Sequence, residues 1–64
     1  MKVGIVKMWD NSKGFGFIED DEGWDYFLNI SKVRPGQKIR EGDKVKFDVF
    51  ESQRGPSAVN VSKY

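Results

Sequence analysis

Apolar and polar residues alternate with a period of two along most of the chain, a pattern typical of β-strands that bury one face. The pattern is clearest from Lys44 to Glu51, where Val45, Phe47 and Val49 alternate with polar residues. No segment has the 3.6-residue period of a convincing amphipathic helix. The alternation predicts five strands, at about residues 2–10, 15–20, 24–30, 44–51 and 57–62.

Turn-forming residues separate the predicted strands. Residues 20–23 have the composition of a hairpin turn, in which Gly23 is free to adopt a positive φ angle. Pro56 is expected just before the fifth strand, where its missing N–H costs least. Val59 and Val61 are expected on one side of that strand.

The longest connection covers residues 31–43 and has room for one short 3₁₀ turn at residues 31–33, before Pro35 and Gly36 interrupt the chain. Five short strands with one longer connection after the third fit a small Greek-key barrel. Closing a sheet into a barrel also removes its exposed edges.

The chain has 64 residues with no Cys and no His, which is enough for one domain over residues 1–64. Disulfides are impossible and the usual soft metal ligands are missing, so we expect no cofactor and a fold that rests on its apolar core. No apolar run approaches the roughly 20 residues of a membrane span. The N-terminus also lacks the long apolar segment of a signal peptide. We therefore expect a cytoplasmic domain. A closed barrel needs no partner to cover its edges, so we also expect a monomer.

The formal net charge is only +1, but the charges are unevenly distributed. Residues 19–25 contain five acidic residues and no basic one, so the rest of the chain carries +6. Such segregation can leave one face of a domain electropositive. The simpler explanation of the acidic segment itself is a solvated turn.

Two phenylalanines flanked by glycines form the most informative segment. Phe15 and Phe17 are two positions apart, so their rings point to the same face of a strand. Gly14 and Gly16 are poor strand residues, and we interpret them as leaving room for a planar ligand to lie on the rings. The alternative is that both rings are core and the glycines mark a bulge.

The residues around this pair favour the surface interpretation. Ile18 lies on the opposite face of its strand from the two rings, so it can fill the core instead. In the third strand Tyr26 and Leu28 form the natural core pair, which leaves Phe27 and polar Asn29 on the other face. Three exposed rings on one sheet face indicate a binding surface.

Nucleic-acid bases suit such a face because every base has a π-face that stacks on aromatic rings. Basic residues at the rim can neutralise phosphates, and Lys7, Lys13 and Arg54 are the candidates for this role. Four further basic residues in the long connection either extend the basic strip or belong to an ordinary solvated loop: Lys32, Arg34, Lys38 and Arg40.

These residues resemble the cold-shock domain family over essentially the whole chain. Residues 13–18 (KGFGFI) are similar to the first ribonucleoprotein-type motif of that family, residues 25–31 (DYFLNIS) to the second, and residues 54–61 to its last loop and strand. The resemblance implies a five-stranded antiparallel Greek-key OB-fold barrel that binds single-stranded RNA or DNA and has no catalytic activity. On the matching positions it implicates Lys7, Lys13, Phe15, Phe17, Asp25, Phe27 and Arg54, with the aspartate expected to bond a base edge.

The chain departs from the family pattern at several stacking positions. Met8 stands where the family has tryptophan, and Trp9, at the next position, is a candidate to replace part of that platform. The second motif ends in Asn29 and Ile30, where the family has histidine and phenylalanine. Asn29 can still bond a base edge. These departures predict weaker, more salt-dependent binding at a site of about 4–6 nucleotides.

The sequence bears on three classes of function. The favoured one is a sequence-tolerant single-strand binder that acts as a passive RNA chaperone. The alternative is a protein-interaction module on the same barrel, with weakened or lost nucleic-acid binding. An enzyme acting on a small-molecule substrate is not expected, because the chain has no His or Cys and its acids gather in a turn where solvent should keep their behaviour ordinary.

Overall fold

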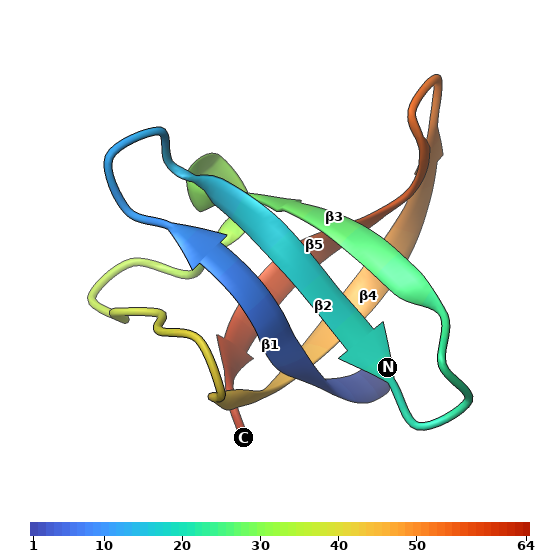
Figure 1. Cartoon of the computed structure of the whole chain (residues 1–64), viewed down its shortest axis with the longest axis horizontal. Helices are drawn as coiled ribbons and strands as arrows, with labels where there is room; N and C mark the ends of the chain where they lie inside the picture. Colours follow the sequence, from blue (N-terminus) through green and yellow to red (C-terminus); the bar gives the residue numbers. More distant parts are fainter.

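The computed structural model describes all 64 residues and contains the five predicted strands. Their order in the barrel is β1-β2-β3-β5-β4, and the barrel is closed (Figure 1). None of the helical structure has the length and apolar composition that a membrane span requires. The elements are β1 (Lys2–Asp10), β2 (Phe15–Asp20), β3 (Asp25–Asn29), the 3₁₀ turn η1 (Ile30–Lys32), β4 (Lys44–Ser52) and β5 (Gly55–Lys63).

Neighbouring strands are antiparallel except at one place. β3 and β5 meet in parallel, through the pairing of Phe27 with Ser57. The long connection returns the chain past the open end of the barrel before β4 begins, so β5 enters beside β3 in the same direction (Figure 1). The expectation of an antiparallel barrel is therefore correct for every pairing but this one.

The interior is filled from all five strands and from the long connection. Tyr26 and Phe47 lie with their ring centroids 5.2 Å apart and close one part of it. Ile18, Tyr26 and Leu28 point inward, as the alternation predicted. The complete core consists of Val6, Ile18, Tyr26, Leu28, Ile39, Val45, Phe47, Ala58 and Val61.

The fifth strand differs from its prediction in two ways. It begins at Gly55, so Pro56 lies inside it, paired with Glu51 near the free end of the β4–β5 hairpin. Val59 and Val61 do not share a side, because Asn60 has a positive φ of 54° and the β4–β5 register shifts at this point. Val61 is buried in the core, whereas Val59 pairs with Asp48 on the outer surface.

The β2–β3 turn is organised by a buried carboxylate. Asp20 accepts hydrogen bonds from the Tyr26 hydroxyl at 2.7 Å and from the backbone N–H groups of Glu22 and Trp24, each at 2.9 Å. Burial alone would raise the pKa of Asp20, but these hydrogen bonds and nearby Lys2 together lower it. The expectation that all acids of this turn behave as solvated groups is wrong for Asp20.

This arrangement predicts an acid-sensitive fold. Because the pKa of Asp20 is lowered in the folded state, its contribution to stability is present above the unfolded pKa of about 3.9 and is lost as pH falls below it. Asp20→Asn is expected to lower the free energy of unfolding at pH 7 and to flatten its decline below about pH 4. Urea unfolding measured from pH 7 to pH 2.5 tests this. An unchanged acid limb in the variant would show that other carboxylates carry the effect.

Candidate nucleic-acid interface

The outer face of β1, β2 and β3 carries a continuous row of apolar side chains. Met8 pairs with Phe17 and Phe17 pairs with Phe27, so the three side chains stand next to each other across the sheet. Phe15 lies two residues from Phe17 on the same side of β2. We call Met8, Phe15, Phe17 and Phe27 the aromatic face.

Phe27 is the central ring of the aromatic face and lies against both other rings. Phe15 and Phe27 are stacked, with centroids 5.9 Å apart and ring planes 27° apart. Phe17 meets Phe27 edge-on, at 5.8 Å and 74°. All three rings are only half-buried and none belongs to the core. Their predicted position outside the barrel is therefore confirmed.

A cation covers the central ring. The guanidinium carbon of Arg54, from the β4–β5 hairpin, lies 4.9 Å from the centroid of Phe27. This distance is within the range of a cation–π interaction. Figure 1 shows this hairpin extending from the body of the barrel beside β3. Arg54 thus occupies a position over Phe27 that a stacked base would also need.

A second cation is held by an acid. The ammonium group of Lys7 donates to both carboxylate oxygens of Asp25, at 2.9 and 3.0 Å. This hydrogen bond is the main reason why the pKa of Lys7 is raised. Both residues are exposed, so the pair is screened by solvent. Lys13, in the β1–β2 loop, is exposed and has no ion pair.

The chain matches the family model for the "'Cold-shock' DNA-binding domain" over residues 2–64. It is 46% identical over 65 residues to the major cold shock protein of Streptococcus pyogenes serotype M1, which covers 98% of this chain and 97% of that protein. The chain belongs to the cold-shock domain family. It is also 47% identical over 62 residues to cold shock-like protein CspB of Bacillus cereus, which covers 94% of this chain and 95% of that protein.

A solved structure supports the fold of this cold-shock domain. The structure of drosophila Unr CSD456 is similar with a TM-score of 0.80 and 22% sequence identity. The match covers 98% of this chain but only 26% of that longer chain, and it bears on the fold alone. The expectation that the chain is not an enzyme agrees with its family.

The departures from the family pattern have distinct structural settings. Met8 is 37% exposed and takes its place on the aromatic face. The side-chain oxygen of Asn29 accepts a hydrogen bond from the backbone N–H of Ser31 at 3.0 Å and so caps η1. Ile30 is 53% exposed but belongs to η1, beyond the end of β3. Asn29 and Ile30 therefore border the aromatic face without adding a flat platform to it.

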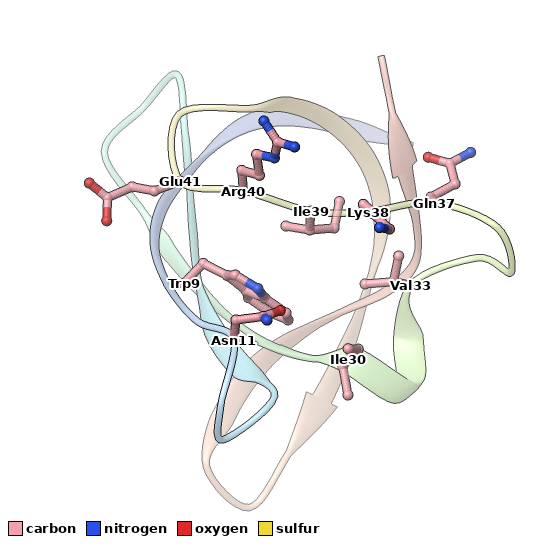
Figure 2. Close-up of a pocket in the computed structure, with 9 residues that line it drawn as sticks. All are labelled: Trp9, Asn11, Ile30, Val33, Gln37, Lys38, Ile39, Arg40 and Glu41. Atoms are coloured by element: carbon pink, nitrogen blue, oxygen red, sulfur yellow. The ribbon is translucent and has the colours of Figure 1, made fainter.

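Trp9 does not replace the missing platform. It pairs with Gly16 and points to the inner side of the sheet, where its ring packs against the core. Figure 2 shows Trp9, Ile39 and Val33 pointing toward one another across the end of the barrel, under the long connection. They line a hollow of about 590 Å³. The indole N–H of Trp9 is buried and has no hydrogen-bond partner. The prediction that Trp9 extends the stacking surface is wrong.

The glycines also have a different role from the one predicted. A Cβ on Gly16 would lie 2.1 Å from the carbonyl oxygen of Met8 and 2.8 Å from the Trp9 ring. Gly14 has a φ of +73°, and a Cβ there would touch Ile30 at 3.0 Å. Both glycines are required by the backbone and by inward packing.

The four basic residues of the long connection do not form one strip. Lys38 and Arg40 line the hollow at the end of the barrel, as Figure 2 shows. Lys32 instead borders a groove next to Phe27. Lys32 also shares a second groove with Arg34, and of the four basic residues it is the one that lines a groove with Phe27.

One exposed ring was missed in the sequence. Phe50 is 60% exposed on β4 and lies on the outer surface, where it pairs with Ser57. The alternation could have predicted its exposure. Phe50 is out of phase with the inward residues Val45 and Phe47 and occupies a position at which the strand should be polar.

The packing around Gly16 gives a test of its role. Gly16→Ala is expected to lower the free energy of unfolding by about 1–3 kcal/mol, because the new methyl group overpacks the Met8 carbonyl and the Trp9 ring. Urea unfolding of the variant and of the wild type measures this. If Gly16 instead served ligand approach, the variant would keep its stability and lose only binding.

Proposed function

We propose that this cold-shock domain binds single-stranded RNA or DNA by stacking bases on the aromatic face. The observation that carries the proposal is the position of Phe15, Phe17 and Phe27, which stand half-buried on the outer sheet with Phe27 against both other rings. A core does not need these rings, because it is already filled by other residues. The name of the matching family, a DNA-binding domain, supports a nucleic-acid ligand.

Stacking explains how such a domain acts on folded RNA without an energy source. Each base stacked on an aromatic ring contributes about 1–3 kcal/mol, whatever its identity. A base held on the protein is not available for pairing. The domain therefore acts as a passive RNA chaperone that favours unpaired strands.

Ligand binding has to change two contacts of the free protein. A base on Phe27 either displaces the Arg54 guanidinium or is clamped beneath it. A phosphate near Lys7 has to compete with the carboxylate of Asp25, and a base edge bonded by Asp25 has to compete with Lys7. Both competitions lower the net gain in free energy on binding.

The affinity is expected to be lower than that of family members with the full set of platforms. Met8, Asn29 and Ile30 replace rings of the family pattern, and Trp9 is turned inward. With fewer stacked bases, phosphate contacts supply a larger share of the affinity, which makes binding steeply salt-dependent.

Removing the central ring tests the proposal. Phe27→Ala is expected to weaken binding of an oligothymidine of about six nucleotides by tenfold or more, because at least one stacking platform is lost. The measurement is fluorescence anisotropy of an end-labelled strand at low salt. This readout is preferable to tryptophan fluorescence, because Trp9 faces inward and Trp24 lies in the β2–β3 turn.

Tyr64→Ala is the matched control. It removes a ring that is 72% exposed but packs on Lys44, at the other end of the β4–β5 ladder. Its affinity should equal that of the wild type. Absence of binding by the wild type even at low salt would refute the proposal and favour the protein-interaction module.

The ion pair of Lys7 makes a second prediction. Lys13→Gln is expected to reduce the slope of log K against log salt by about 0.7, the contribution of one phosphate contact on a single strand. Lys7→Gln should change the slope less, because Asp25 already neutralises this cation. Anisotropy titrations at four salt concentrations measure both slopes. A larger change for Lys7 would mean that the ligand breaks the pair completely.

A further inference from the structure

The row of outward-facing side chains continues beyond the aromatic face. Phe27 pairs with Ser57 of β5, and Ser57 pairs in turn with Phe50 of β4. Residues that pair directly across a sheet point to the same side. Phe50 therefore stands on the same outer surface as Phe27, two strands further round the barrel.

A groove separates the two rings. It has a volume of about 190 Å³, and Phe27 and Phe50 are its only aromatic lining residues. Lys32 is the one charged residue in the lining, and no acid takes part. The remaining lining residues are small, polar or aliphatic: Asn29, Ser52, Ser57, Ala58 and Val59.

One of the serines that line the groove offers a hydrogen-bond acceptor. Ser52 donates its only hydroxyl proton to the carbonyl oxygen of Gly55 at 2.8 Å. In the 3.1 Å hydrogen bond between the two serine hydroxyls, Ser57 is therefore the donor and Ser52 the acceptor. The oxygen of Ser57 keeps a free lone pair, which can accept an N–H from the edge of a base.

Phe50 contributes little to the barrel itself. It is 60% exposed and does not belong to the core. A single exposed apolar residue needs no explanation, but this ring lies on the same outer surface as the aromatic face and lines one groove together with Phe27 and Lys32. Phe50 and Phe27 are two strands apart, and neighbouring strands are about 4.8 Å apart. A base on Phe50 therefore does not displace a base on Phe27.

We propose that the groove between Phe27 and Phe50 is an additional subsite for one base of a bound single strand. The base stacks on Phe50 above Ser57, and Lys32 neutralises the adjoining phosphate. The inference rests on the proposed function, since the occupant is the next nucleotide of the strand that lies on the aromatic face.

The test is an abasic scan of oligothymidine by anisotropy. Wild type and Phe50→Ala are titrated with a seven-nucleotide strand and with versions in which one abasic residue replaces each nucleotide in turn. Phe50→Ala is expected to weaken binding of the intact strand about fivefold or more. When the abasic residue is at one particular end of the strand, wild type and Phe50→Ala should bind that strand equally. The base that Phe50 would hold is then already missing. Phe50→Trp should restore or increase the affinity.

The controls separate this inference from the function on which it rests. Tyr64→Ala should bind all strands like the wild type, and urea unfolding should show that Phe50→Ala remains folded. If Phe27→Ala weakens binding but Phe50→Ala does not, the subsite is refuted and the proposed function stands. If Phe50→Ala loses the same affinity relative to the wild type for every abasic strand, Phe50 holds no particular base and the subsite is also refuted. A wild type that binds no strand refutes both.

Discussion

The interior of this barrel holds only one of the two sets of side chains that each strand carries, and the aromatic face depends on that constraint. On β2 and β3 the inward set is Ile18, Tyr26 and Leu28, which are fully or almost fully buried. The alternation of a strand then forces Phe17 and Phe27 to the outside. The chain thus places large rings in solvent as a geometric consequence of filling its core with other residues.

The same constraint explains which parts could be predicted from the sequence. Strand positions and the outward direction of Phe15, Phe17 and Phe27 follow from period-two alternation, which needs no tertiary information. The irregularity at Asn60 could not be predicted, because an Asn in a strand pattern does not by itself indicate a positive φ angle. One such residue reverses the side on which Val59 lies.

Contacts between segments that are far apart in the chain also could not be predicted from the sequence. The role of Gly16 is decided by Trp9 and by the Met8 carbonyl on a neighbouring strand, so its sequence neighbours suggested a wrong reason for its presence. The pairing of Lys7 with Asp25 and the position of Arg54 over Phe27 likewise depend on register and on how the hairpin folds back. The sequence motifs identified these residues as a group but did not show that they pair with one another in the free protein.

The outward-facing rings are distributed unevenly around the barrel. Toward β1 the row ends in the thioether of Met8, because the only nearby indole is used to close the end of the barrel. Toward β4 the row gains Phe50, and Ser57 lines the groove between the rings of Phe27 and Phe50. A closed barrel has no sheet edge at which such a row must stop. The row of outward-facing rings can therefore shift around the barrel by single substitutions at outward positions, while the inward residues that determine the fold remain unchanged.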